Sequence, residues 1–171
     1  MIGRRELMVG AGAAAGLTPA LAWTRTLGAA PAVALYDARF EEAHRFAAAM
    51  ERSGALTLET GRDVAGLWYG RLREIAAACP GLPIAGLATH ADFDVIRGCA
   101  AEARLKLVHH AIHDGRSGLS HRVLRGPDGG ALTRAGPAWP EALAARLGGA
   151  PSAAPAAAKG YAGTLVSWMI T

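Results

Sequence analysis

The stretch LKLVHHAIHDGRSGLSHRVLRG, residues 105–126, decides how the rest of this 171-residue chain is interpreted. It contains four of the six histidines and has the pattern of a strand, a glycine-rich loop and a returning strand. On a strand His109 and His113 share one face, whereas His110 points to the other. A loop centred on Ser117 would place His113 directly opposite His121 on the returning strand.

Upstream of this stretch, predicted strands alternate with predicted helices. The strands are 32–36, 55–58, 82–87 and the one that begins at 105, and the helices between them are 40–52, 64–79 and 91–103. Strands separated by helices at this spacing imply right-handed crossovers and a sheet covered on both faces. The sequence therefore predicts an α/β fold: an open three-layer sandwich with a mostly parallel sheet, for which flavodoxin-like winding is one arrangement.

Downstream of the stretch the pattern changes. A turn is predicted at 127–130, a short helix at 140–147, a linker of small residues at 148–160, and a final strand at 163–170. We expect this last strand at a sheet edge, so that the fold ends in a hairpin and an edge strand. Residues 32–171 are predicted to form a single α/β domain.

The composition excludes several classes of protein. The hydrophobic fraction of 51% is sufficient for a proper core and excludes a disordered chain. The net charge of +4 is spread without a run of like charges, so a nucleic-acid-binding surface is not indicated. No glycine-rich dinucleotide loop follows a strand, and no cofactor is identified.

The first 22 residues, MIGRRELMVGAGAAAGLTPALA, have the three parts of an export signal. A short basic start precedes a weakly apolar run, and small residues end the segment at Ala22. The apolar run is too short and too rich in glycine to predict a membrane span. Residues 23–31 follow as a tether to the first strand.

The start of this segment resembles the twin-arginine (Tat) leader family. Arg4 and Arg5 are paired, and the apolar Leu7 and Met8 follow them. The sequence departs from the family pattern at Gly3, where Ser or Thr is usual, and at Leu7, where Phe is commonest. The resemblance implies export of the folded protein to the periplasm by the Tat machinery. A general secretory leader, an uncleaved anchor and a buried Ala/Gly helix are the alternatives.

The two cysteines, Cys79 and Cys99, fall in the second and third predicted helices. In flavodoxin-like winding these helices lie side by side on one face of the sheet. An oxidising compartment would then permit a disulfide, and two buried free thiols are the other alternative.

Polar side chains follow each predicted strand, at the edge where open α/β sheets bind ligands. They are Asp37 and Arg39 after the first strand, Thr60, Arg62 and Asp63 after the second, Thr89, His90 and Asp92 after the third, and His109, His110, His113 and Asp114 on the fourth. As ligand-binding candidates we take Arg39, Asp63, Thr89 and His109. The other interpretation of Asp63 and Thr89 is that each caps a helix.

As catalytic candidates we take His113, His121 and Asp37. Two imidazoles facing each other across a hairpin could share a metal ion or a proton-transfer task, so His113 and His121 are also the candidate metal ligands. The alternatives are exposed loop histidines or a core histidine with satisfied hydrogen bonds. A triad of Ser117 or Ser120 with His121 and Asp114 is rejected, because no strand-turn-helix elbow surrounds either serine.

These features together favour an exported accessory or small-ligand-binding protein without a complete catalytic motif. One alternative is a histidine-dependent or metal-assisted periplasmic enzyme, hydrolase-like in chemistry. The other is a partner subunit of an exported redox enzyme, with strand 163–170 and Trp168 at the interface.

Overall fold

The computed structural model describes residues 33–127, 129–148 and 163–171. The predicted leader at 1–22 and tether at 23–31 lie outside these residues, as does the predicted linker apart from residue 148. Within the described ranges, no helix has both the length and the apolar character needed to cross a membrane.

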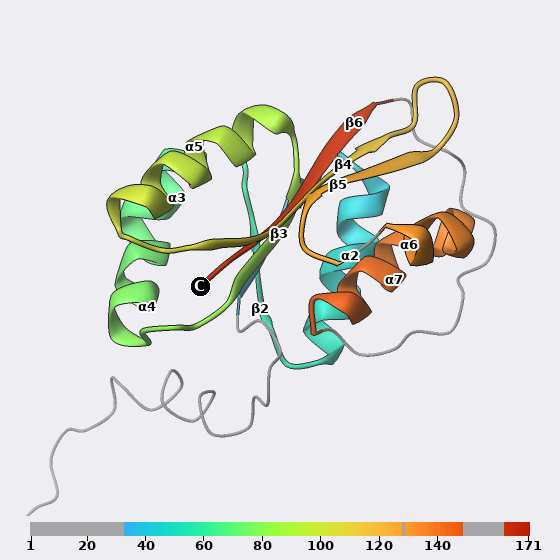
Figure 1. Ribbon diagram of the computed structural model, residues 1–171. Coiled ribbons are helices and arrows are strands. Elements are labelled where there is room, and N and C mark those ends of the chain that lie inside the picture. The colour runs from blue at the N-terminus through green and yellow to red at the C-terminus, as the bar shows by residue number, and fades with distance from the viewer. Residues whose placement is uncertain (1–32, 128, 149–162) are drawn as a thin grey trace, which may run out of the picture.

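Six strands and several helices make up the described chain (Figure 1). The strands are β1 (Val33–Tyr36), β2 (Leu56–Glu59), β3 (Ile84–Ala88), β4 (Leu107–Asp114), β5 (Ser120–Arg125) and β6 (Thr164–Ile170). The helical segments are α2 (Glu41–Arg52), α3 (Val64–Leu67), the π-helical turn η1 (Trp68–Leu72), α4 (Arg73–Ala78), α5 (His90–Glu102), α6 (Gly130–Ala135), the 3-10 turn η2 (Gly136–Ala138) and α7 (Trp139–Arg146). Helix α6 was not predicted from the sequence, which indicated only a turn at 127–130 before it.

The strands form one sheet in the order β2-β1-β3-β6-β4-β5. Strand β1 pairs in parallel with β2 and β3, whereas the β3–β6, β6–β4 and β4–β5 pairings are antiparallel. The predicted α/β class is therefore confirmed, but the prediction of a mostly parallel sheet is wrong. The order also differs from flavodoxin-like winding, because β6 lies between β3 and β4.

The final strand is central, so the prediction of a C-terminal edge strand is wrong. Strand β6 pairs along its length with β3 on one side and β4 on the other. Gly86 on β3 makes this pairing feasible, because a Cβ atom there would collide with the indole of Trp168. Trp168 is fully buried, which also removes the proposed interface on this strand.

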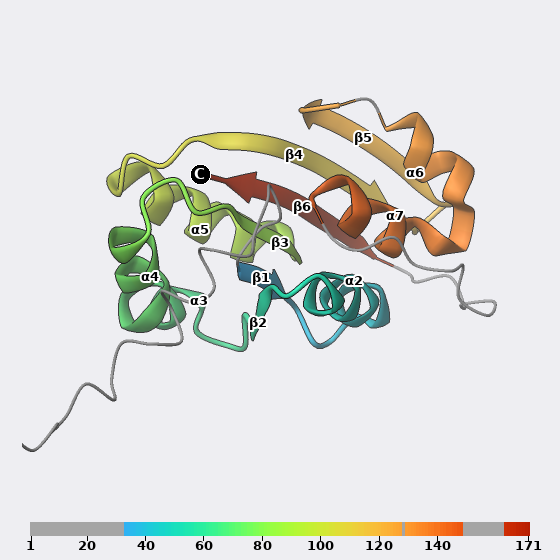
Figure 2. The ribbon, with the colours of Figure 1, turned by 90° about the horizontal axis from the view of Figure 1, so that it is seen from below.

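Two layers of helices cover the sheet, and each has its own apolar core (Figures 1 and 2). Helix α5 and the continuous segment from α3 through α4 bury Trp68, Leu72, Phe93 and Ile96 against one face. Helices α2, α6 and α7 bury residues such as Phe46 against the other face. The described chain is thus a three-layer α/β/α arrangement, as predicted.

A buried ion pair joins two helices of the second layer. The guanidinium of Arg45 on α2 donates to both carboxylate oxygens of Glu141 on α7, at 2.8 and 2.7 Å. It also donates to the carbonyl oxygen of Pro137 at 2.8 Å. Glu141 is almost fully buried, so Arg45 supplies the charge that its burial requires.

Both cysteines are free thiols. Cys79 follows α4 and is partly buried, whereas Cys99 is buried within α5. The sequence left a disulfide and two free thiols as alternatives, and the structure has the free thiols.

Candidate functional site

The carboxyl ends of β2, β1 and β3 meet at one edge of the sheet. Main-chain hydrogen bonds join them there, from Thr60 N–H to the carbonyl of Tyr36 at 2.9 Å and from Asp37 N–H to the carbonyl of Leu87 at 3.2 Å. The helix after β1, α2, packs on one face of the sheet, and the helix after β3, α5, packs on the other. The segments that follow β1 and β3 therefore leave the sheet toward opposite faces. Open α/β sheets form a ligand crevice at such a point.

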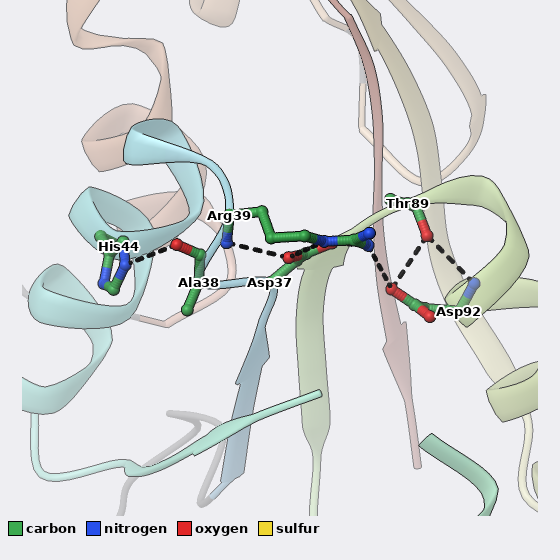
Figure 3. Close-up of polar contacts among 6 residues, drawn as sticks. All are labelled: Asp37, Ala38, Arg39, His44, Thr89 and Asp92. Carbon is green, nitrogen blue, oxygen red and sulfur yellow. Dashed lines mark hydrogen bonds and ion pairs between the residues drawn. The ribbon is translucent and has the colours of Figure 1, made fainter. Parts of the chain in front are cut away.

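Asp37 fixes the position of Arg39 at this edge (Figure 3). Its Oδ1 accepts from the backbone N–H and from Nε of Arg39, at 3.0 and 2.9 Å, and its Oδ2 accepts from Nη2 at 2.6 Å. The Asp37 side chain is only 3% exposed, whereas that of Arg39 is 66% exposed. A buried carboxylate thus holds a guanidinium that faces solvent.

Thr89 and Asp92 complete the arrangement from the other side of the crevice (Figure 3). Thr89 is the N-cap of α5, where its Oγ1 accepts from Asp92 N–H and donates to Asp92 Oδ2 at 2.9 Å. The same Oδ2 lies 3.9 Å from Nη2 of Arg39. The capping interpretation of Thr89 is confirmed, and the cap also orients a carboxylate toward Arg39.

Thr60 adds an unusual polar group beside Asp37. It is 2% exposed, and its Oγ1 has no hydrogen-bond partner among the described residues. A buried hydroxyl without a partner costs about 1–3 kcal/mol. Thr60 follows β2, on the side of β1 away from β3, so we refer to Asp37, Arg39, Thr89 and Asp92 together as the edge cluster.

The negative charge of Asp37 is stabilised by its contacts with Arg39. Burial acts to raise the pKa of the Asp37 carboxyl, but the hydrogen bonds from Arg39 and its positive charge outweigh burial and lower that pKa. Asp37 is therefore ionised at neutral pH. With Asp92 also a carboxylate, the single guanidinium is outnumbered by negative charges.

Asp63, another predicted ligand-binding residue, serves a local structural role. It is the N-cap of α3, and its Oδ1 accepts from the backbone N–H of Gly66 at 2.7 Å. A Cβ atom at Gly66 would collide with this carboxylate. The capping interpretation is confirmed, since the carboxylate is already engaged.

Three of the histidines, His109, His113 and His121, form a separate group on the face of the sheet that α7 covers. The register pairs His113 with His121 across the β4–β5 hairpin, as predicted. The Nδ1 atoms of the two rings are 2.7 Å apart. Ser167 of β6 extends the contact, because its Oγ lies 2.8 Å from Nε2 of His113 and 2.9 Å from Nε2 of His109. We call His109, Ser167, His113 and His121 the histidine–serine chain.

This chain is buried beneath Trp139 of α7. The indole stacks on His113 with ring centroids 4.4 Å apart, and its centroid is 5.2 Å from that of His121. Burial lowers the pKa of His109 to about 4, with smaller effects from the charges of Arg146 and His110. Burial also lowers the pKa of His113 well below its ordinary value and lowers that of His121. All three rings are therefore neutral at pH 7.

The structure separates Asp37 from the two catalytic histidine candidates. Strands β3 and β6 lie between β1 and β4, which places the Asp37 backbone three strand spacings, about 14 Å, from that of His113. Arg39, which Asp37 binds, lies near Asp92 of α5, whereas His113 stacks on Trp139 of α7. The three predicted catalytic residues do not form one site.

The contact between His113 and His121 has hydrogen-bond geometry. Two ring nitrogens bound to one tetrahedral zinc ion would be about 3.3 Å apart, which is longer than the 2.7 Å separation of the Nδ1 atoms. Within the described part of the chain, no cluster of three or more His, Cys, Asp or Glu side chains could hold a metal ion. The arrangement suits proton sharing.

Sequence reasoning missed Ser167 and Trp139. Ser167 is the one polar residue in the middle of the apolar segment TLVSWMI, and a lone hydroxyl in such a strand is a signal that could have identified it. Trp139 precedes Pro140 at the start of α7, and nothing in its local sequence indicates the histidines that it covers.

Comparison of the chain with protein-family models, with curated proteins and with solved structures finds no match.

Proposed function

We propose that this protein is an exported accessory protein that binds a small polar ligand at the edge cluster. The observation that carries this proposal is the pairing of exposed Arg39 with buried Asp37 at the point where β1 and β3 diverge. A guanidinium that is already oriented loses little freedom when it binds a ligand. Its Nη1 makes no hydrogen bond within the described residues, so two donors remain for a ligand.

The charges of the edge cluster indicate the class of ligand. Asp37 and Asp92 outnumber Arg39, so a bare inorganic anion would be repelled. A ligand that offers both acceptors and donors fits better, because it can accept from Arg39 Nη1 and donate to Asp92. Small hydroxy acids, amino acids and sugars have this chemistry.

A thermal-shift screen of such compounds tests the binding proposal. Ligands that stabilise the wild-type protein should lose most of that effect in Arg39→Ala. Arg62→Ala is the matched control, because Arg62 is an exposed arginine near the same edge and makes no hydrogen bond in the described residues. Equal ligand-induced shifts in wild type and Arg39→Ala would contradict the proposal.

Export is proposed from the leader alone. Replacing Arg4 and Arg5 by lysine should retain the full-length protein in the cytoplasm if the Tat machinery exports it, because this route reads the arginine pair. Fractionation of the native host measures the outcome. Undiminished periplasmic protein in the double variant would favour the general secretory route.

A further inference from the structure

We propose that the histidine–serine chain is a buried proton relay. It links three strands, from His109 on β4 through Ser167 on β6 and back to His113, and then to His121 on β5. The inference is independent of the edge cluster, which lies at the carboxyl ends of β1 and β3 and shares no residue with the histidine–serine chain.

The first step of the argument concerns the hydrogens that the four groups can share. A neutral imidazole has one N–H donor and one acceptor nitrogen, and a serine hydroxyl has one donor. The contacts of 2.9, 2.8 and 2.7 Å can all be hydrogen bonds when every donor points the same way along the histidine–serine chain, and also when His109 and His113 both donate to Ser167. Only the first kind of arrangement lets Ser167 accept one proton and donate another, so the relay requires it. In an arrangement that can relay a proton, His109 and His121 have the same tautomer and His113 has the opposite one.

Two such arrangements exist. In the first, Nε2–H of His109 donates to Ser167, Ser167 donates to Nε2 of His113, and Nδ1–H of His113 donates to Nδ1 of His121. In the second, every one of these bonds is reversed. Neutral rings are required in both, and burial of His109 and His113 disfavours the charged form.

The ends of the chain provide the second observation. Nδ1 of His109 and Nε2 of His121 are buried and have no hydrogen-bond partner among the described residues. These two atoms are the positions at which a proton would enter or leave. A Cβ atom at Gly126 would lie 3.0 Å from Nδ1 of His109, so this end lies directly beneath the turn that follows β5.

The two arrangements interconvert by transfer of protons along the existing bonds. A proton from a water molecule binds Nδ1 of His109, whose Nε2 proton passes to Ser167. The Ser167 proton passes to Nε2 of His113, and the Nδ1 proton of His113 passes to Nδ1 of His121. The Nε2 proton of His121 leaves to a second water, so one proton enters, one leaves, and every ring ends neutral.

The packing around the histidine–serine chain favours proton transfer back and forth over repeated transfer in one direction. Each transfer reverses the direction of every hydrogen bond in the histidine–serine chain. A second proton could move in the same direction only after the imidazole rings had rotated. The stacked indole of Trp139 opposes rotation of His113. The chain therefore exchanges one proton back and forth between its two ends.

Nuclear magnetic resonance of the full chain, labelled with ¹⁵N in its histidine rings, tests this inference at pH 7. We expect His109 and His121 to share one tautomer, His113 to have the opposite tautomer, and a single exchange rate to describe all three rings. That rate should fall in D2O by more than the viscosity of D2O explains. Three static rings, or a charged His113, would overturn the relay.

Variants separate the relay from independent ring motion. Ser167→Ala should abolish the correlation of His109 with His113 while His113 and His121 remain paired. Ser120→Ala is the control, because Ser120 is an exposed serine on β5 opposite Asp114. Exchange at His109 that is unchanged in Ser167→Ala would overturn the inference. If Ser167→Ala does not fold, Ser167→Thr keeps the hydroxyl, and the D2O comparison on the wild type still decides.

Discussion

Trp168 on β6 occupies the space that a side chain at Gly86 on β3 would need. The two residues are register partners in the centre of the sheet, and the indole is fully buried. This contact fixes the final strand between β3 and β4, so the sheet depends on a glycine in an otherwise apolar strand.

The first prediction is that Gly86→Ala destabilises the fold. The added methyl group must displace the Trp168 indole, and overpacking of this kind costs about 1–3 kcal/mol. Urea denaturation measures the free energy of unfolding. Gly98→Ala is the control, because a Cβ atom at Gly98 in α5 meets open space and the helix should gain up to about 1 kcal/mol. Equal stabilities of the two variants would contradict the proposed packing.

The second prediction concerns the pair of Arg45 and Glu141. Arg45→Met leaves the carboxylate of Glu141 buried without its partner, which should cost about 3 kcal/mol of unfolding free energy. Adding Glu141→Leu should recover most of that loss, since no buried charge remains. The double-mutant cycle by chemical denaturation gives the coupling. Additive losses in the double variant would show that the ion pair does not join α2 to α7.

The third prediction is a loss of stability in mild acid. In the unfolded chain the His109 ring binds a proton near pH 6.5, whereas its pKa in the folded protein is about 4. Between these values the unfolded state holds more protons, so stability falls as the pH falls from 6.5 to 4. This difference corresponds to about 3 kcal/mol, and the lowered pKa of His113 acts in the same direction.

Urea denaturation of wild type and His109→Gln at pH 7.5, 5.5 and 4.5 measures this dependence. The variant removes the titrating ring, so its unfolding free energy should change less with pH than that of wild type. Arg146 of α7 and His110 are the charged or titratable groups that influence this ring, and both are unchanged in the variant. Parallel curves for the two proteins would contradict the assignment to His109.

The fourth prediction is that the chain contains two free thiols. Partly buried Cys79 should react with a thiol reagent before buried Cys99 in the folded protein, because reaction requires access to the sulfur. Unfolding without a reductant should make both available. Failure to detect thiols in unfolded, unreduced protein would indicate a disulfide instead.

The histidine hairpin could be predicted from the sequence because its information is local. The length of the loop around Ser117 fixes the register, and the register fixes which side chains face each other. That reasoning placed His113 opposite His121 and His109 on the same face as His113, and in the structure both His109 and His113 contact Ser167. Local capping patterns likewise identified Asp63 and Thr89 at helix starts.

The position of β6 could not be predicted because it depends on distant contacts. Residues 126–163 separate this strand from the β4–β5 hairpin, and no local pattern states which strands it joins. The decisive feature is the fit of Trp168 against Gly86, which is visible only once both strands are in the sheet. The same placement brings Ser167 between His109 and His113. The role of Ser167 was missed for this reason.

The edge cluster was predicted in part. Arg39, Asp37 and Thr89 were identified because they follow strands whose carboxyl ends share one edge. The grouping of Asp37 with His113 and His121 is not found in the structure, where Asp37 lies apart from both rings and pairs with Arg39. The apolar sequence of a strand does not indicate which neighbouring side chains a polar residue beyond its end will contact.

A crystal structure of the protein with the compound that gives the largest thermal shift tests the central claim most directly. We predict density for that compound between β1 and β3, with an acceptor atom within hydrogen-bond distance of Nη1 of Arg39 and a donor near Asp92. Density for the compound elsewhere on the molecule, with Arg39 still free at Nη1, would contradict the account.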